Sequence, residues 1–328
     1  MLIMADMACS DTLARFYFNL FTRIFSATSV VCNLLVLVAC QHQQKIMKIY
    51  GRMMSLAAGC NVFCSLIVIV VGMKTVPHGD LFFYFTDSPF LLYSSQLTQQ
   101  LFVHVTFATF YVHAGLPAIQ FFIRYKIIKD AHAGLSVLYT SFLGLVLFSC
   151  TYSFSYAIDF QKPSETWRQL LFSSVEGCNL DNVLPTYSVI NKTSISSRIH
   201  KFLAVGVLCG SSVVVIYYGV LTWFHFKQRL GNTTYHATKF NRDLNLVLTF
   251  QAILPFTFIV LPNSLFLANL VPRHMASTVG LVANFGSTLS PLMDALIVLF
   301  IIPAFRKNVL KPLHGTTRSS SNTLFLTQ

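Results

Sequence analysis

Charged residues are scarce in this sequence: Lys, Arg, Asp and Glu together make up 10% of its 328 residues. Soluble domains carry about 25% charged residues, so the deficit excludes an ordinary water-soluble protein. The sequence also lacks the repeated ten-residue alternation of apolar and polar residues that is typical of a transmembrane β-barrel. Hydrophobic residues, in contrast, reach 54%. Because hydrocarbon offers the backbone no hydrogen-bond partner, the chain is expected to cross the membrane as helices.

The signatures of several other protein classes are missing as well. We find no H-E-x-x-H zinc motif, no G-x-S-x-G elbow and no P-loop, so neither an enzyme nor a cofactor is predicted. No internal repeat indicates an inverted-repeat transporter. Cys60 and Cys64 share a helical face, but no flanking His or Cys completes a metal site. The net charge of +12 accompanies no nucleic-acid-binding module, so nucleic acid is not an expected partner.

Seven apolar stretches are long enough to cross a bilayer, which requires roughly 20 residues. They are Phe16–Cys40, Met53–Met73, Phe90–Ile123, Leu135–Ile158, Phe202–Phe226, Leu244–Leu270 and Met275–Ile302. The third contains a polar run from Ser94 to Gln100, which a helix tolerates when it borders a water-accessible cavity inside a bundle. The predicted fold is an all-α membrane protein, a seven-transmembrane helix bundle.

Basic residues indicate the orientation of this bundle. With the N-terminus outside, 14 Lys and Arg lie on the cytoplasmic side and the remaining 9 on the other side. Because positive charge favours the cytoplasm, the N-terminus is expected outside and the C-terminus in the cytoplasm, where the basic residues also attract anionic membrane lipid. The expected domains are an extracellular tail over 1–15, the helical domain over 16–303 with a long external loop over 159–201, and a disordered cytoplasmic tail over 304–328.

This orientation has two chemical consequences. The triplet Asn191-Lys192-Thr193 lies in the external loop and is expected to be glycosylated, whereas the triplet that begins at Asn232 should stay unmodified. Cys9 and Cys178 are the two cysteines expected to face the oxidising exterior, so one disulfide is possible between them.

Asp294 is the acidic residue that lies well inside a predicted span, towards its cytoplasmic end. A charge in the membrane costs at least about 2.5–3.5 kcal/mol, so Asp294 must face the bundle interior and find a partner. Asn33 and Asn61 lie at similar depth and could join it. The group is interpreted as a polar switch between two packings of the bundle; the alternative is an interior carboxylate that only specifies helix register.

Prolines interrupt two of the spans. Pro255 and Pro262 lie in the sixth and Pro291 in the seventh. Proline removes a backbone donor and kinks a helix, and such kinks either let the helix ends swing or simply fill space.

Polar and aromatic residues in the outer halves of the spans predict a small-ligand site. Such sites are mostly apolar with a few polar contacts. The candidate ligand contacts are Gln96, Gln99, Gln100, Phe102, His104, Phe107 and Asn269. For His104, the alternative is a purely structural hydrogen bond.

Four motifs at the expected depths carry a family resemblance. Gln251-Ala-Ile-Leu-Pro255 with Pro262 resembles the sixth-helix signature of nematode serpentine chemoreceptors of the Str superfamily. The run from Pro291 through Asp294 to Pro303-Ala-Phe305-Arg306 is similar to that superfamily's seventh helix. Arg124-Tyr125 after the third span and Asn33-Leu-Leu-Val in the first resemble its other motifs, although Ile123, Ala295 and Phe305 depart from the usual residues.

The resemblance implies a G-protein-coupled chemosensory receptor in the plasma membrane of a sensory cilium, detecting a small environmental molecule or peptide. By itself, Arg124 would be one more cytoplasmic basic residue; the resemblance makes it part of a G-protein-coupling surface. That surface would comprise Arg124, Tyr125, Lys126, Lys129, Arg229 and Arg242. Serines of the tail, Ser319, Ser320 and Ser321, with Thr323, would be phosphorylated during desensitisation, with arrestin as a possible partner. The alternative function is a membrane transporter or ligand-gated channel.

Overall fold

The computed structural model describes residues 12–41, 48–78, 81–86, 88, 90–91, 94–130, 135–161, 164–175, 186–191, 193–229, 235–267, 270 and 276–303. Its helices are α2 (Thr12–Gln41), α3 (Lys48–Val71), α4 (Gln96–Lys129), α5 (Leu135–Ser155), α6 (Glu165–Val175), α7 (Ile195–Arg229), α8 (Tyr235–Pro255), α9 (Leu261–Leu267) and α10 (Ala276–Ile301). A 3-10 turn, η2 (Tyr156–Asp159), extends α5, and a π-helical turn, η5 (Phe256–Val260), joins α8 to α9.

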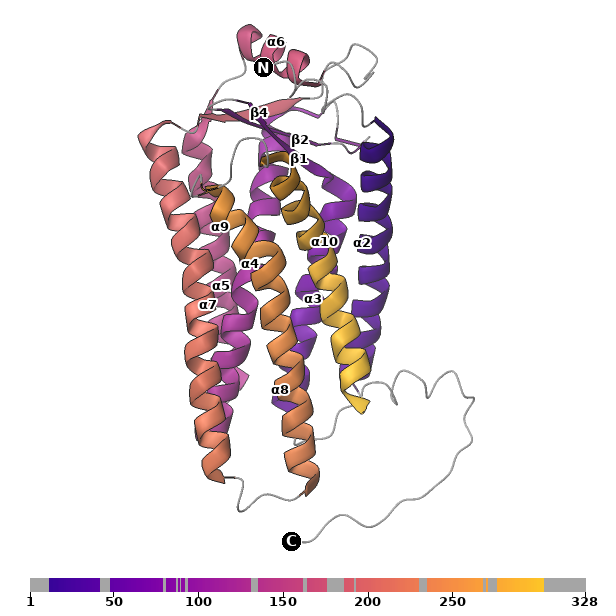
Figure 1. Ribbon diagram of the computed structural model, residues 1–328, viewed down its shortest axis with the longest axis vertical. Coiled ribbons are helices and arrows are strands. Elements are labelled where there is room, and N and C mark those ends of the chain that lie inside the picture. The colour runs from indigo at the N-terminus through magenta and orange to yellow at the C-terminus, as the bar shows by residue number, and fades with distance from the viewer. Residues whose placement is uncertain are drawn as a thin grey trace.

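The described helices form a seven-transmembrane bundle, as predicted. Six segments have the length and hydropathy to cross a membrane, and a shorter apolar helix, Phe285–Ile301, supplies the seventh. Of the six, α4 is the most buried, and it packs against α3, α5, α7 and α8. α2 starts at the end of the bundle that carries a β-sheet, the sheet end, and α10 finishes at the opposite end (Figure 1). An odd number of crossings requires this arrangement.

A four-stranded antiparallel sheet closes the sheet end, a feature that the sequence pattern did not indicate. It contains β1 (Met73–His78), β2 (Leu81–Thr86), β3 (Phe160–Gln161) and β4 (Tyr187–Asn191), in the order β1-β2-β4-β3. The lower face of the sheet, with Phe82 and Ile190, packs on the bundle. Its upper face packs against Trp167 and Leu170 of α6, and Figure 1 shows α6 above the sheet. Because both faces are covered, the central strand β2 is almost continuously apolar.

Two predicted span boundaries were wrong, and helix-capping residues explain where these helices begin. α4 begins at Gln96 rather than Phe90, because the Ser95 side chain accepts the N–H of Thr98 at 3.2 Å. α7 begins at Ile195 rather than Phe202, where Ser194 accepts the N–H of Ser197 at 3.1 Å. The loop predicted over 159–201 therefore contains β3, α6, β4 and the start of α7. Between α3 and β1, Gly72 adopts a φ of 54°, a left-handed conformation that ends α3.

Two of the predicted prolines bracket the irregular part of the sixth span. Pro255 ends α8, the π-turn η5 follows, and Pro262 lies in α9. Because Pro262 has no N–H, the carbonyl of Phe258 four residues earlier loses its usual helical donor. The seventh span approaches this carbonyl group closely: a methyl group added to Gly286 of α10 would lie 2.5 Å from the carbonyl oxygen of Phe258. Glycine thus permits the close backbone approach on which helix packing in membranes depends.

Candidate functional site

A buried polar cluster joins α2, α3 and α10 in the interior of the bundle. The Asn61 side-chain amide donates to Asp294 Oδ2 and to Asn33 Oδ1, each at 3.3 Å. Asn33 in turn donates to the carbonyl oxygen of Pro291 at 3.0 Å and to that of Ser29 at 2.9 Å. All three predicted switch residues are at most 6% exposed. The structure therefore brings together the residues that the sequence placed at similar depth.

Serines extend this cluster, which we call the polar core (Asn33, Asn61, Asp294, Ser29 and Ser65). The Ser65 hydroxyl donates to Ser29 Oγ at 2.9 Å, linking α3 to α2 once more. Neither serine was predicted from the sequence to belong to the cluster. Their spacing was a usable signal, because Ser29 precedes Asn33 by four residues and Ser65 follows Asn61 by four, which places each pair on one helical face.

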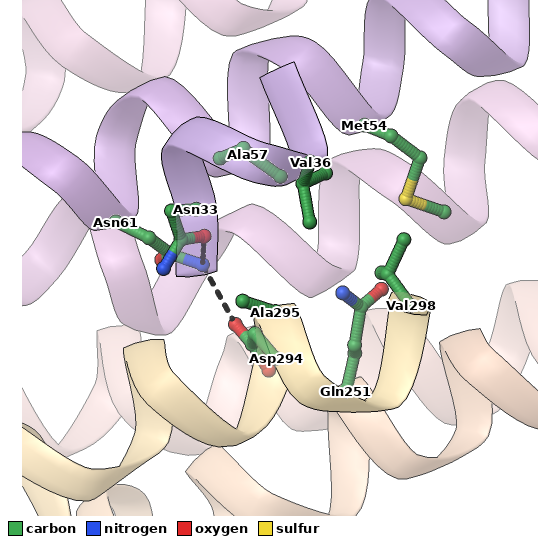
Figure 2. Close-up of a pocket in the computed structure, with 10 residues that line it drawn as sticks. Asn33, Val36, Met54, Ala57, Asn61, Gln251, Asp294, Ala295 and Val298 are labelled. Carbon is green, nitrogen blue, oxygen red and sulfur yellow. Dashed lines mark hydrogen bonds between the residues drawn. The ribbon is translucent and has the colours of Figure 1, made fainter. Parts of the chain in front are cut away.

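The polar core has more acceptors than donors. Among the described residues, Asp294 Oδ1, Asn61 Oδ1 and Gln251 Oε1 are buried oxygens without a hydrogen-bond partner. A cavity lies beside them, in which the centre of a water molecule can occupy about 10 Å³. Figure 2 shows Asn33 and Asn61 on one side of it and Gln251 and Asp294 on the other. This space is enough for about one water molecule. A buried acceptor without a donor costs about 1–3 kcal/mol, so these oxygens favour a water molecule or a rearrangement that supplies a donor.

A second polar contact crosses the bundle one turn from Asp294. His113 Nε2 of α4 lies 3.0 Å from Ser290 Oγ of α10, and both residues are buried. Neither residue was predicted from the sequence. The contact links α4, which spans the whole bundle, to the helix that carries Asp294.

Arg124 lies in the half of α4 that is away from the sheet end and is 0% exposed. It is within electrostatic range of Tyr50 on α3. The buried apolar residues Phe121 and Ile123 flank it in sequence and belong to the main hydrophobic core. The predicted coupling residue is therefore enclosed in this conformation rather than presented on the surface.

The other predicted coupling residues surround this end of α4. The Tyr125 ring lies 5.4 Å from the rings of both Tyr218 and His225 on α7. Lys126 and Lys129 are exposed, with their ammonium groups 5.9 Å and 5.8 Å from the centroids of Phe122 and Tyr125, respectively. Arg242 is exposed on α8, and the side chain of Arg229 lies outside the described residues.

Aromatic side chains fill the sheet end of the bundle. Phe107 of α4 contacts Tyr84 of β2 and Tyr156 of η2, with ring centroids 5.5 Å apart in both pairs. Tyr84 also contacts Phe160 of β3. We call Tyr84, Phe107, Tyr156 and Phe160 the aromatic cluster. Burial raises the pKa of Tyr84, and the nearby Asp159 charge raises it further, so the phenol remains a neutral donor.

Two more of the predicted ligand contacts are buried, and one of them, His104, lies beside this cluster. The His104 ring is 5.3 Å from that of Phe160, and its Nδ1 lies 3.0 Å from the carbonyl oxygen of Ser153, which ties α4 to α5. This is the structural hydrogen bond that the sequence analysis gave as the alternative. Gln99 is 1% exposed, and neither polar atom of its side chain has a partner among the described residues.

The family comparison agrees with this architecture. The family model described as "Serpentine type 7TM GPCR chemoreceptor Str" matches residues 18–310, which include every helix that crosses the bundle. The chain belongs to this family. It is a multi-pass membrane protein with a chemosensory receptor role, and its family is one of receptors rather than enzymes. No curated protein matches the chain.

Several predicted features of the receptor are not brought together or lie outside the described residues. Gln96, Gln100 and Phe102 are half-buried on α4. Asn269, Cys9 and Cys178 lie outside the described part of the chain, as does the tail over 304–328. Pro255, Pro262 and Pro291 are buried in their helices. Within the described residues, no group of three or more His, Cys, Asp or Glu could hold a metal ion.

Proposed function

We propose that this chemoreceptor binds a small, largely apolar molecule beside the aromatic cluster and signals to a heterotrimeric G protein at the opposite end. In this proposal the sheet end faces the extracellular medium and the basic end of α4 faces the cytoplasm. The aromatic cluster would supply apolar contacts, and the amide of Gln99 would offer one donor and one acceptor to the ligand. The sheet and α6 cover this end, which favours a small molecule over a peptide.

The polar core is the observation that carries the proposal. It lies between the aromatic cluster and Arg124, and its contacts bridge α2, α3 and α10. His113 adds α4 through Ser290. His104 and Arg124 are separated by roughly 30 Å along α4, at 1.5 Å per residue. Unpartnered acceptors in such a core favour a second packing, and a ligand that binds the second packing more tightly would shift the population.

Arg124 supports the same interpretation. Enclosing a guanidinium between helices is costly in a membrane protein. We infer that the described packing is the resting one and that activation exposes Arg124 to the G protein, together with Tyr125, Lys126, Lys129 and the basic residues of the neighbouring loops. During this activation, the proline-flanked π-turn of the sixth span would let α8 move relative to α9.

A ligand screen tests the proposal. Cells that express the full chain with a promiscuous Gα subunit would be exposed to a panel of small organic molecules, with intracellular calcium as the readout. We expect Asp294→Asn to lower ligand potency about fivefold, because the new amide donates to an unpartnered oxygen and stabilises the resting packing by about 1 kcal/mol. Phe107→Ala should weaken the response by removing a ligand contact.

Two matched variants serve as controls for this screen. The exposed Thr140 hydroxyl donates to the carbonyl oxygens of Ser136 and Val137 in its own helix, so Thr140→Ala should respond like the wild type. Phe63 is 52% exposed on α3, so Phe63→Ala should do the same. The proposal would be contradicted if the receptor reached the cell surface but no molecule raised calcium through any Gα subunit. Unchanged ligand potency in Asp294→Asn would also contradict it.

Glycosylation tests the proposed orientation. Asn191 ends β4 at the sheet end, and its side-chain oxygen accepts the N–H of Thr193 at 2.9 Å and the hydroxyl of Thr193 at 2.7 Å. If this end is extracellular, Asn191→Gln should abolish a glycosidase-sensitive shift in gel mobility. Asn232→Gln, in the segment between α7 and α8, should leave that shift intact. The reverse pattern would show that the receptor has the opposite orientation in the membrane.

A further inference from the structure

The polar core holds one carboxylate and too few hydrogens for its oxygens. The amide group of Asn61 uses its two hydrogens on Asn33 Oδ1 and Asp294 Oδ2. The amide group of Asn33 donates to Ser29 and to the carbonyl oxygen of Pro291. Neither amide therefore has a hydrogen left for Asp294 Oδ1, which is buried and without a hydrogen-bond partner among the described residues. No Lys, Arg or His in that part of the chain forms an ion pair with Asp294.

Gln251 brings a further oxygen to the same place from the sixth span. It lies on α8 and is 3% exposed, and its Oε1 has no hydrogen-bond partner within the described residues, as is true of Asn61 Oδ1. Gln251, Asn61 and Asp294 all line the cavity described above. Figure 2 shows the Gln251 side chain extending between Ala295 and Val298 towards α2 and α3. Side chains with unsatisfied oxygens from α3, α8 and α10 thus border a space of about one water molecule.

An occupant of this cavity has to satisfy three acceptors and balance one negative charge. A water molecule donates two hydrogen bonds and carries no charge, and a proton on Asp294 neutralises the carboxylate but supplies only one hydrogen. A hard cation does both, because carboxylate and amide oxygens are its preferred ligands. A divalent ion would leave one positive charge uncompensated inside the membrane, which is costly, and Mg²⁺ would keep several waters for which there is no room. Neither His nor Cys is present among the described residues that line the cavity, which disfavours a transition metal.

We propose that this cavity binds one Na⁺ ion through Asp294, Asn61 and Gln251. Na⁺ is the smaller of the two abundant alkali cations, and it is smaller than the water molecule that the cavity admits. Its single charge matches the single carboxylate of the polar core. Bound there, the ion ties α8 to α3 and α10 and so holds the sixth span in the described packing.

The bound ion would regulate the switch that the polar core provides, and this part of the inference rests on the proposed function. Na⁺ exchanges with the medium, so it is a reversible clamp on the resting packing. A ligand that shifts the receptor to its second packing would expel the ion, and Na⁺ would oppose activation through its preference for the resting state. The binding of Na⁺ to the folded protein does not depend on this coupling.

Thermal unfolding of the purified full-length receptor in detergent tests the site with Na⁺ itself as the probe. The Tm is measured in NaCl, KCl and choline chloride at the same ionic strength of about 0.15 M, so that general screening is equal in all three. An ion that binds only the folded state raises the Tm, and the wild type should unfold about 3 °C higher in NaCl than in choline chloride. KCl should give a smaller rise, because the larger ion fits the cavity less well.

Three variants assign the effect to this cavity. Asp294→Asn keeps the shape of the side chain but removes its charge, so its Tm should be the same in NaCl and in choline chloride. Gln251→Leu removes one ligand oxygen and keeps the charge, so about tenfold more Na⁺ should be needed for half of the Tm rise. Asn263→Leu is the matched control, because the Asn263 amide lies in the same span and donates to the carbonyl oxygen of Ile259 at 2.7 Å. Asn263 does not line the cavity, so the Na⁺ dependence of this variant should equal that of the wild type.

A wild-type Tm that is equal in NaCl and choline chloride would overturn the site, as would a full Na⁺ effect in Asp294→Asn. An equal rise with K⁺ would overturn the assignment to Na⁺. Should Asp294→Asn fail to fold, Gln251→Leu decides: a weakened Na⁺ effect supports the site, and a wild-type effect overturns it.

Basal calcium signalling addresses the regulation separately. In cells that express the receptor with the promiscuous Gα subunit, replacement of extracellular Na⁺ by choline should raise the basal signal about twofold, and cells with Asp294→Asn should show no such rise. If the Tm depends on Na⁺ but the basal signal does not, the proposed function is contradicted and the Na⁺ site stands.

Discussion

Gly286→Val should abolish delivery of this receptor to the cell surface, and Gly286→Ala should reduce it about tenfold. A Cβ atom at this position would lie 2.5 Å from the carbonyl oxygen of Phe258, 2.6 Å from its Cβ and 3.0 Å from its carbonyl carbon. Two of these three atoms belong to the backbone of η5, which cannot turn aside as a flexible side chain can. Overpacking of this kind costs about 1–3 kcal/mol, and more where the backbone must shift.

Gly206 of α7 is the matched control for this change. A Cβ atom there meets nothing within 4 Å, and the residue is exposed on the outer surface of the bundle. Gly206→Val should therefore reach the surface at close to the wild-type level. Surface labelling of an epitope tag on intact cells measures both variants. Equal labelling of Gly286→Val and Gly206→Val would show that α10 and η5 do not pack as described.

Arg124→Ala should lower the potency of the ligand response by at least about tenfold, while the purified protein keeps a Tm close to the wild-type value, because the desolvation cost that is removed offsets the packing that is lost. The side chain is fully buried in the described packing, where it interacts electrostatically with Tyr50. Its removal should leave the resting packing intact and eliminate the proposed contact with the G protein. Arg124→Lys should recover only part of the response, because an ammonium lacks the planar fork of guanidinium.

Arg52→Ala controls for the loss of one basic residue at the same end. Arg52 is exposed in the first turns of α3, so its removal should change neither stability nor response beyond the usual small effect of a surface substitution. The measurement pairs a dose–response curve with the Tm of each purified variant. A robust response from Arg124→Ala would show that coupling does not need this residue. A large fall in its Tm would assign Arg124 a structural role instead.

Part of the polar core could be predicted from the sequence, and part could not. Asp294 is conspicuous because a carboxylate inside an apolar run requires an interior position, whatever the details of the fold. The same reasoning placed Asn33 and Asn61 at the right depth, and the structure brings all three together. Ser290 and His113 were not selected, because their pairing joins positions 177 residues apart and depends on the rotation of two helices about their axes.

The sheet end was harder to predict for a related reason. The run Leu81-Phe-Phe-Tyr-Phe-Thr86 has no alternation of polar and apolar residues, and so it does not separate a strand from part of a helix. It becomes a strand because β4, more than 100 residues later, supplies its hydrogen-bond partners and because both of its faces are covered. The contact of Tyr84 with Phe107 likewise joins two elements that no local sequence pattern brings together.

Composition and apolar run length determined that this chain is a bundle of membrane-spanning helices, because transfer of a segment into hydrocarbon depends on that segment alone. Tertiary structure decided which polar groups meet and which stay without partners: Asn61 with Asp294, His200 with Asp159, and the enclosed Arg124. These contacts join residues that are distant in sequence, and a shift of one helix by a few ångströms, or its rotation by one residue, would break them. Local hydrophobicity carries no information about such a shift.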